Sequence, residues 1–263
     1  MDSSPQGKRI GELPTVGFGQ FVKSYTGETV VLSSYKNGKE MYRQLIKAGI
    51  SDDRIIDAGN VIYELTEKAI YFDLEQCRTQ GEKEIFIDAG GFDGLTTQRF
   101  MEWCKGNGYS YIFEPDKRNR VFIKNNLKQN LDYETVPKAL WSRTASLAID
   151  AKGNFASTVS ELDRDRDKNP KEYIESISLD EFVHDRKITY IKMDIEGAET
   201  EALKGAERVI REQRPKLALS IYHRAEDIWE IPSLILQYCP DYQFYLRHYS
   251  FSDYDTVLYA VPS

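Results

Sequence analysis

The chain has 263 residues, of which 41% are hydrophobic and 29% are charged, enough for one large α/β domain or an ordinary domain with an appendage. Its 35 Lys and Arg and 42 Asp and Glu give a net charge of -7 without a basic block, which argues against a nucleic-acid partner. No apolar run suits a membrane span, and the N-terminus lacks a signal-peptide core. Three cysteines without CxxC spacing favour a reducing compartment. We therefore expect a cytoplasmic protein without membrane contact.

The first 80 residues predict a small α/β appendage. Residues 29–34 form a short strand-like run, residues 40–47 carry apolar side chains at helical spacing, and Ile55 and Ile56 form a second apolar pair. This order predicts one β-α-β unit, followed by a linking helix from about residue 64 to residue 80. Such a unit has too little apolar surface to stand alone, so we expect it to pack on the main domain or to form a homo-oligomer. The predicted domains are residues 1–80 and 81–263.

From residue 84 onward, short β-branched runs alternate with helix-period segments, which is typical of an α/β fold with a mostly parallel sheet. The last two runs lie close in sequence and predict an antiparallel hairpin at one edge. Between the third and fourth runs, residues 141–185 form a long stretch whose alternating charges at 163–168 indicate a solvated face. The predicted strands are residues 85–88, 109–113, 134–136, 188–193, 216–222, 242–247 and 256–261.

A glycine-rich turn follows the first predicted strand of the main domain. The strand ends at Asp88, glycines occupy positions 90, 91 and 94, and a helix is predicted from about Leu95. Such a turn lets a ligand approach the backbone and aims helix N–H groups at it. The spacing is neither the GxGxxG of a dinucleotide site nor that of a Walker loop. We therefore expect a small cofactor without a pyrophosphate, with a purely structural turn as the alternative.

The second predicted strand ends in Glu114, 20 residues after Gly94. A carboxylate at this end of a strand can accept both hydroxyls of a ribose. Pro115 ends the strand, and Asp116 is predicted to cap the helix that follows. The glycine turn and Glu114 together indicate a nucleoside-containing ligand.

Two further strands bring acidic side chains and a histidine to the same edge. Asp194 and Glu196 follow the fourth strand, and His223 follows the fifth. Because ligands bind at the carboxyl ends of parallel strands, we favour a functional role for all three, with a structural histidine as the alternative for His223. Glu199, at the start of the next helix, is predicted to compensate the helix dipole.

Six motifs in this order resemble the FkbM-type family of S-adenosylmethionine-dependent methyltransferases, over about residues 84–261. The resemblance implies a class I methyltransferase sheet of Rossmann-like form, S-adenosyl-L-methionine as cofactor, and O-methylation of a small, often sugar-derived, acceptor. The loop Gly91-Phe92-Asp93 departs from the family's commoner Gly-Ala-Asn. The motifs are IDAGGFDGLTT, FEPD, PKAL followed by Ser, SLDEF, IKMDIEGAE and IYHRAEDIWEIP.

The resemblance also implies roles for individual residues. The turn would flank the methionine part of the cofactor, Glu114 would hold the ribose hydroxyls, and Ala139 and Leu140 would line the adenine pocket. The variable residues 141–185 and the N-terminal unit are expected to shape the acceptor pocket. The expected cofactor-binding residues are Asp88, Ala89, Gly90, Gly91, Asp93, Gly94, Glu114, Pro115, Ala139 and Leu140.

Methyl transfer to a hydroxyl needs an aligned attack and a base for the acceptor proton. His223 suits this role better than a free carboxylate, because an imidazole has a pKa near about 6.5. Asp194 would orient or share the proton, and Glu196 lies beside it in sequence. We rank a metal-free site above a divalent metal held by Asp194 and Glu196.

Two other functions fit parts of the sequence. An NAD-dependent oxidoreductase would use Glu114 equally well, but the glycine loop is wrong for it, and the Tyr-x-x-x-Lys spacing occurs only at residues 35–39. A non-catalytic module could bind a nucleoside or nucleotide-sugar, with the first 80 residues as an interaction arm. The expected partner in every case is a small molecule, possible acceptors being a sugar or a nucleotide-sugar.

Overall fold

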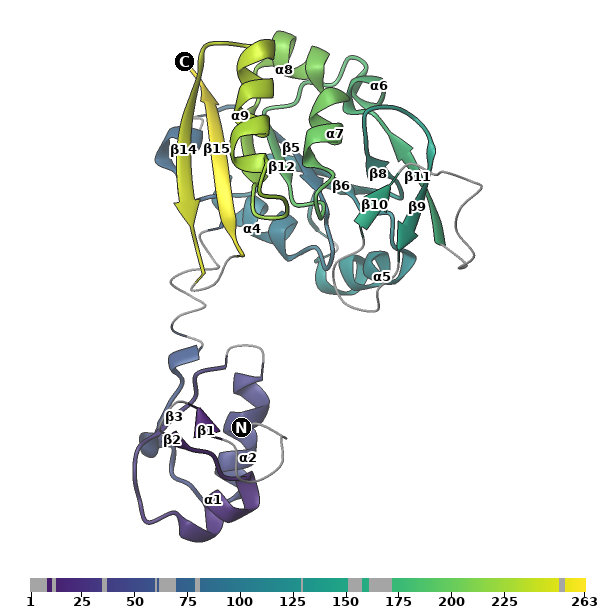
Figure 1. Ribbon diagram of the computed structural model, residues 1–263. Coiled ribbons are helices and arrows are strands. Elements are labelled where there is room, and N and C mark those ends of the chain that lie inside the picture. Colours follow the sequence, from purple (N-terminus) through teal and green to yellow (C-terminus); the bar gives the residue numbers. More distant parts are fainter. Residues whose placement is uncertain are drawn as a thin grey trace. The chain divides into compact units, whose positions relative to one another are not determined.

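The computed structural model describes residues 9–10, 13–34, 37–59, 61, 70–78, 81–128, 130–150, 158–160, 172–250 and 254–263. Its contacts divide the chain into a unit of residues Met1–Ala69 and a unit of residues Ile70–Ser263. The second unit thus starts at Ile70 rather than at residue 81, because Tyr71, Phe72 and Leu74 are buried in its core. Figure 1 shows both units.

The linking helix predicted from about residue 64 to residue 80 lies partly outside the described residues. Over the described part, residues 70–78, the prediction is wrong. The chain forms turns there and one short 3-10 helix, η3 (Glu75–Cys77). Tyr71 has a φ of 72°, which no α-helical residue adopts, so a continuous helix cannot pass through it.

The first unit contains the predicted β-α-β arrangement. Strand β3 (Val30–Val31) pairs in parallel with β4 (Ile55–Ile56), and helix α2 (Gly38–Lys47) connects them. Leu32, Leu45 and Ile50 form the buried centre of this unit. The remaining elements are β1 (Arg9–Ile10), β2 (Leu13–Pro14), α1 (Phe18–Ser24) and η1 (Asp52–Arg54).

A seven-stranded sheet in the order β14-β15-β13-β12-β5-β6-β7 forms the second unit. Strands β13, β12, β5, β6 and β7 are parallel, and β15 runs antiparallel to both β13 and β14. The mostly parallel sheet with an antiparallel edge hairpin is therefore confirmed. The strands are β5 (Glu84–Ala89), β6 (Gly108–Phe113), β7 (Tyr133–Val136), β12 (Tyr190–Met193), β13 (Lys216–Ser220), β14 (Tyr242–His248) and β15 (Thr256–Pro262).

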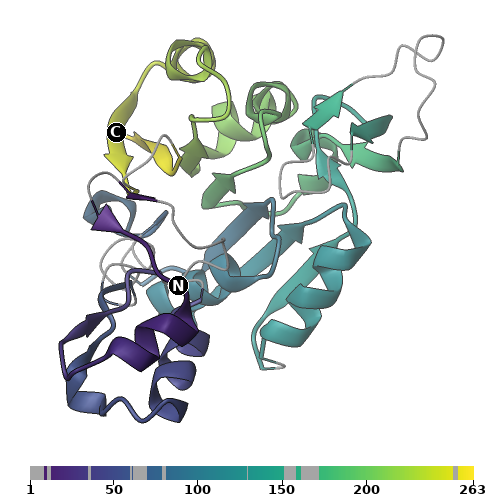
Figure 2. The ribbon, with the colours of Figure 1, turned by 60° about the horizontal axis from the view of Figure 1, so that its bottom comes forward.

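Helices cover both faces of this sheet. On one face, α6 (Leu179–Val183), α7 (Glu199–Lys204), α8 (Glu207–Gln213) and α9 (Asp227–Tyr238) share a buried apolar cluster with the sheet. On the other face, α4 (Leu95–Trp103) and α5 (Lys117–Asn126) pack on β5 and β6. Figure 2 shows α5, in teal, across the strands from the green helices. Alternation along β12 therefore sends Ile191 and Met193 to the first face and Tyr190 and Lys192 to the second.

The helix predicted to follow Asp194 is divided into α7 and α8. Five apolar residues of these two helices and the joint between them are fully buried. The division falls at Gly205, where an added Cβ would lie 2.1 Å from the Trp141 carbonyl oxygen. The backbone therefore passes too close to the neighbouring strand region for any side chain at this position. The buried positions are Ala202, Leu203, Ala206, Val209 and Ile210.

A second, four-stranded sheet occupies much of the stretch from residue 141 to residue 185, where no strand was predicted. Its order is β10-β9-β11-β8, and Leu147 and Ile174 contribute its buried side chains. The alternating charges at residues 163–168 lie outside the described residues. The strands are β8 (Ala139–Leu140), β9 (Ser146–Asp150), β10 (Thr158–Ser160) and β11 (Glu172–Ile177).

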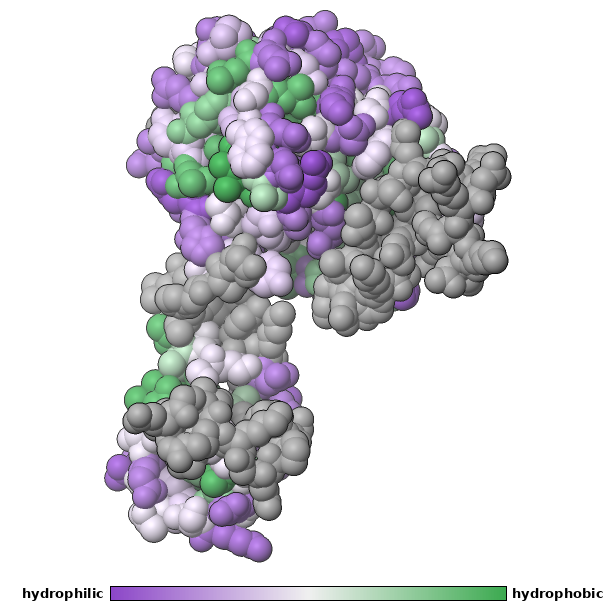
Figure 3. All heavy atoms as spheres, viewed as in Figure 1, coloured by the Kyte–Doolittle hydropathy of each residue, from purple (hydrophilic) through white to green (hydrophobic). Residues whose placement is uncertain are grey.

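Apolar side chains gather on one part of the surface of the second unit. Figure 3 shows them over α9 and the neighbouring β14, and the exposed apolar residues of these elements are Ile228, Trp229, Leu236 and Leu246. No helix within the described ranges combines the length and the apolar character that a membrane crossing requires.

Candidate functional site

A pocket of about 260 Å³ opens at the carboxyl ends of β5, β6 and β12. This is the edge at which open parallel sheets bind ligands. Polar groups come from the loops after β6 and β12, and apolar groups come from β8 and the start of α7. The lining residues are Gly90, Phe92, Phe113, Glu114, Pro115, Asp116, Asn119, Ala139, Leu140, Asp194, Ile195, Glu196 and Ala198.

The glycine turn after β5 passes unusually close to the strand beside it. Gly90 has a φ of 81°, and a Cβ added there would lie 2.0 Å from the Asp194 carbonyl oxygen. A Cβ on Gly91 would lie 2.1 Å from the Ile112 side chain. Both positions therefore require glycine, and the two loops that carry Gly90 and Asp194 form one continuous wall of the pocket.

Glu114 is held by the backbone at the opposite side of this turn. One carboxylate oxygen accepts the Phe92 N–H at 2.8 Å, and the other accepts the Asp116 N–H at 2.9 Å. The residue is 5% exposed, and burial raises the pKa of its carboxyl above the ordinary value. A carboxylate fixed in this way keeps lone pairs for hydroxyl donors that enter the pocket.

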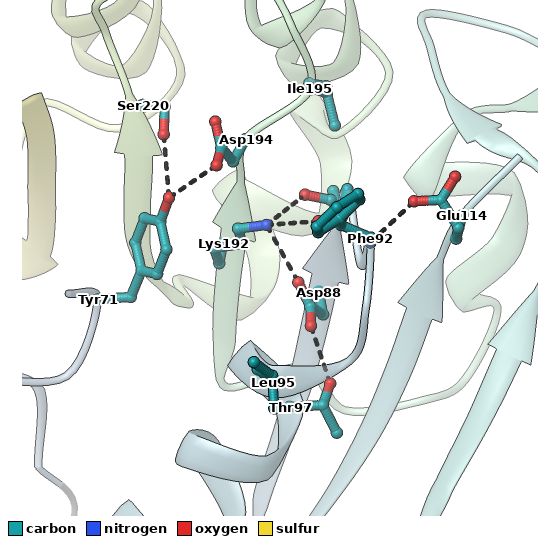
Figure 4. A network of polar contacts seen from close by, with 12 residues as sticks. Tyr71, Asp88, Phe92, Leu95, Thr97, Glu114, Lys192, Asp194, Ile195 and Ser220 are labelled. Atoms are coloured by element: carbon teal, nitrogen blue, oxygen red, sulfur yellow. Dashed lines mark hydrogen bonds and ion pairs between the residues drawn. The ribbon is translucent and has the colours of Figure 1, made fainter. Parts of the chain in front are cut away.

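A buried ion pair supports the turn from beneath. The Lys192 Nζ donates to the carbonyl oxygens of Ala89 and Gly90, at 3.0 and 2.8 Å, and lies 3.2 Å from Asp88 Oδ1. Asp88 Oδ2 accepts a hydrogen bond from the Thr97 hydroxyl at 2.9 Å. Figure 4 shows this chain of contacts. Lys192 thus joins the end of β5, the turn and the start of α4 into one rigid support.

Asp194, directly after β12, is bound by two tyrosine hydroxyls. Tyr71 donates to its Oδ2 at 3.0 Å, and Tyr222 donates to its Oδ1 at 3.1 Å. Burial acts to raise the pKa of Asp194, but the charges of Lys192 and His223 outweigh it and lower that pKa below the ordinary value. Asp194 is therefore an ionised, oriented carboxylate on the pocket wall.

His223 lies behind this carboxylate with its two ring nitrogens in different surroundings. Nδ1 lies 2.9 Å from Glu199 Oε1, and we assign the ring proton to Nδ1 because a carboxylate only accepts. Nε2 lies 3.5 Å from Asp194 Oδ1 and 3.6 Å from Glu196 Oε2. No residue in the described part of the chain forms a hydrogen bond with Nε2. When the ring is neutral, it therefore presents the Nε2 lone pair toward the acidic wall of the pocket.

The carboxylates around His223 set its protonation. Burial acts to lower the pKa of this histidine, but the hydrogen bond and charge of Glu199, with Asp194 and Glu196, outweigh burial and raise it above the ordinary value. Burial raises the pKa of Glu196 as well. The cluster therefore holds a histidine whose charged form is stabilised by three acidic neighbours.

The family of the chain follows from comparison with known proteins. The model of the methyltransferase FkbM domain matches residues 88–250, which is more than half of the chain. The chain belongs to the FkbM methyltransferase family. The predicted family and the class I methyltransferase sheet are therefore confirmed.

Solved structures with the same fold include one of this family. Methyltransferase FkbM from Methylobacillus flagellatus KT is 29% identical, with a TM-score of 0.60, over 75% of this chain and 49% of that protein. The present chain thus spans about half the length of that relative. A precorrin-6y C5,15-methyltransferase from Geobacter metallireducens GS-15 is 13% identical, with a TM-score of 0.45, over 82% of this chain and 97% of that one. No curated protein matches the chain.

The FkbM pocket contains many of the predicted site residues. Its wall includes, among the predicted cofactor-binding residues, Gly90, Glu114, Pro115, Ala139 and Leu140, and among the predicted catalytic residues Asp194 and Glu196. His223 does not line the pocket itself but contacts Asp194 and Glu196. The prediction that the acidic residues face the ligand side of the sheet agrees with this arrangement.

Other predicted cofactor-binding residues are not among those that line the pocket. Asp88 is fully buried and pairs with Lys192, so its carboxylate supports the turn and does not reach the pocket. Ala89 is fully buried at the end of β5. Gly91 packs against Ile112, Asp93 accepts the Leu95 N–H, and Gly94 precedes α4.

Sequence reasoning missed three residues of this FkbM site. Lys192 belongs to the motif IKMDIEGAE, but no role was predicted for it, although the alternation of β12 places it on the same face as Tyr190. Tyr222 precedes His223 and was read only as the end of a strand. Tyr71 lies before the first motif, so no pattern pointed to it. Glu199 was assigned to the helix dipole, whereas its carboxylate contacts His223 and the Ile195 N–H.

One group of side chains in the described ranges has the spacing of a metal site. Asp194, Glu199 and His223 each offer a ligand atom, and these atoms lie within 4.8 Å of one another. This set replaces the predicted pair of Asp194 and Glu196 as the geometric candidate for a cation. The Glu199 carboxylate already accepts a hydrogen bond from the Ile195 N–H and faces His223 Nδ1. We therefore still favour a site without a metal.

Proposed function

We propose that this protein transfers the methyl group of S-adenosyl-L-methionine to a hydroxyl of a small, sugar-derived acceptor. The observation that carries the proposal is a single pocket with two chemically different sides. One side has the glycine turn and the fixed Glu114 carboxylate, and the other has Asp194 and Glu196, with His223 behind them. Membership of the FkbM methyltransferase family supports the reaction class.

The residues of the first side fit the parts of the cofactor. Glu114 offers charged acceptor atoms for the ribose hydroxyls. Ala139, Leu140 and Pro115 offer an apolar surface for the adenine. Gly90 and the loop that carries Asp194 line the pocket together, and the methionine part would lie against this wall. The cofactor supplies a methyl group on a positively charged sulfur, which the acidic wall of the pocket suits electrostatically.

The second side would handle the acceptor proton. An alcohol is far less acidic than an imidazolium, so its proton must leave as the oxygen attacks. In its neutral form, His223 would take that proton at Nε2 by way of Asp194 or Glu196, the neighbouring carboxylates that line the pocket, and Glu199 would stabilise the imidazolium that results. Asp194 would accept a hydrogen bond from the same or a neighbouring acceptor hydroxyl and so orient it for an in-line attack.

Calorimetry with S-adenosylhomocysteine, NADH and nucleotide-sugars in parallel tests this function against the two alternatives. We expect S-adenosylhomocysteine to bind and NADH not to bind, because the turn lacks a seat for a pyrophosphate. Binding of NADH alone would favour the oxidoreductase. Binding of a nucleotide-sugar alone would favour the non-catalytic module. A labelled-methyl transfer screen against cell extract and sugar libraries then identifies the acceptor.

A further inference from the structure

Tyr71 lies in the segment that precedes the matched family region of residues 88–250, yet it reaches the candidate site. Its φ of 72° is in the left-handed region, which a residue with a large side chain rarely adopts. It is also one of the buried residues of the second unit, with 7% exposure. Strained backbone of this kind persists only where the surroundings enforce it, and it is concentrated at functional sites.

The surroundings of Tyr71 do enforce this conformation. Its carbonyl oxygen accepts a hydrogen bond from the Tyr190 hydroxyl. The next residue, Phe72, packs against the rings of Phe86 and Tyr190, with centroids 5.7 and 5.9 Å away. The turn at residues 70–72 is thus anchored in the aromatic core beneath the sheet, and the direction of the Tyr71 side chain is fixed.

The fixed side chain ends at Asp194. The Tyr71 hydroxyl lies 3.0 Å from Asp194 Oδ2 and 3.2 Å from Ser220 Oγ, as Figure 4 shows. Tyr222 binds the other carboxylate oxygen, which lies 3.5 Å from His223 Nε2. The two phenols therefore hold the carboxylate from both sides and leave it little freedom to rotate.

We propose that Tyr71 is a positioning residue of the acceptor site, which holds the Asp194 carboxylate toward His223 Nε2. The proposal rests on the function proposed above and extends the site to a segment outside the matched family region. A purely structural tyrosine would need only its ring and its packing. The role argued here belongs to the hydroxyl, because the hydroxyl is the part that contacts Asp194.

The Tyr71→Phe variant tests this role, with Tyr249→Phe as the matched control. Tyr249 also has a buried hydroxyl, which bonds to Asp73 and Tyr259 at 2.6 Å, but it does not contact the site. We would follow the protonation of His223 by nitrogen-15 NMR, which needs no acceptor. The charged groups that face His223 are Glu199, Asp194, Glu196 and Asp227, and Lys192 acts on Asp194.

In Tyr71→Phe we expect the pKa of His223 to fall, because a released Asp194 carboxylate stabilises the imidazolium less. Tyr249→Phe should leave that pKa unchanged, and both variants should bind S-adenosylhomocysteine as the wild type does. Once an acceptor is known, kcat of Tyr71→Phe should be about 10-fold lower, the scale for one hydrogen bond to a charged group. An unchanged or raised pKa of His223 in Tyr71→Phe overturns the proposal.

A second probe keeps the test valid if Tyr71→Phe fails to fold. Replacement Tyr71→3-fluorotyrosine retains the ring and the hydroxyl, and its fluorine resonance should move when Asp194→Asn is introduced. An unmoved resonance would show that the hydroxyl does not bind Asp194, and the proposal would fail. Failure of the wild type to bind S-adenosylhomocysteine would instead refute the proposed function, whatever the resonance does.

Discussion

Glu114 provides the sharpest prediction about the cofactor side of the pocket. In the wild type its carboxylate accepts two backbone N–H groups, at 2.8 and 2.9 Å, and offers its remaining lone pairs to the ribose. Glu114→Ala removes a charged acceptor whose hydrogen bonds contribute about 1.5 to 3 kcal/mol. That loss corresponds to a decrease of about 10- to 150-fold in the affinity for S-adenosylhomocysteine.

Isothermal titration calorimetry measures this affinity directly. Glu134→Ala removes the same charge from an exposed position on β7 and should leave the affinity unchanged. The 2′-deoxy analogue of S-adenosylhomocysteine separates ribose binding from support of the Phe92 loop. It should bind more weakly than the parent compound to the wild type but equally to Glu114→Ala. If Glu114→Ala binds S-adenosylhomocysteine within about twofold of the wild-type affinity, the change is well below the expected decrease of at least about 10-fold. That result would remove Glu114 from the site.

The remaining predictions concern catalysis and the pocket wall. His223→Ala should lower kcat by roughly 10²- to 10⁴-fold, with cofactor affinity and melting temperature nearly unchanged. Wild-type turnover in this variant would exclude His223 as the base. Activity should rise with pH as His223 loses its proton, with a midpoint above the ordinary value because Glu199 raises that pKa, and Glu199→Gln should move the midpoint to lower pH. Gly90→Ala should abolish S-adenosylhomocysteine binding in calorimetry, because the new Cβ would lie 2.0 Å from a backbone oxygen. A chelator should leave activity unchanged, whereas loss of activity restored by magnesium would assign a metal to Asp194, Glu199 and His223.

Much of the fold follows from local patterns that the sequence displays directly. Parallel strands buried on both faces read as short apolar runs, and their carboxyl ends are marked by Asp88, Glu114, Asp194 and the residues after β13. Because those ends share one edge, the position of the pocket and most of its polar wall were predictable. The capping role of Asp116 was predictable too, and its side chain accepts the Arg118 N–H as expected.

Contacts between distant segments were not predictable in the same way. Lys192 lies in an apolar strand, and only the register of β12 with β5 places its ammonium beneath the Gly90 turn. Tyr71 reaches Asp194 through a left-handed turn, which no residue type at that position signals. The strands of the second sheet are short, and the polar residues 161–171 separate β10 from β11 in the sequence, so their pairing depends on the fold around them.

In the function proposed here, one pocket binds the cofactor by its ribose and presents the methyl donor to the acidic cluster. A crystal structure of the complex with S-adenosylhomocysteine tests it most directly. We predict that the ribose hydroxyls lie within hydrogen-bonding distance of Glu114 and that the sulfur faces the side of Asp194 and His223. A ligand bound outside this pocket, or bound with its sulfur turned away from Asp194 and His223, would contradict the account.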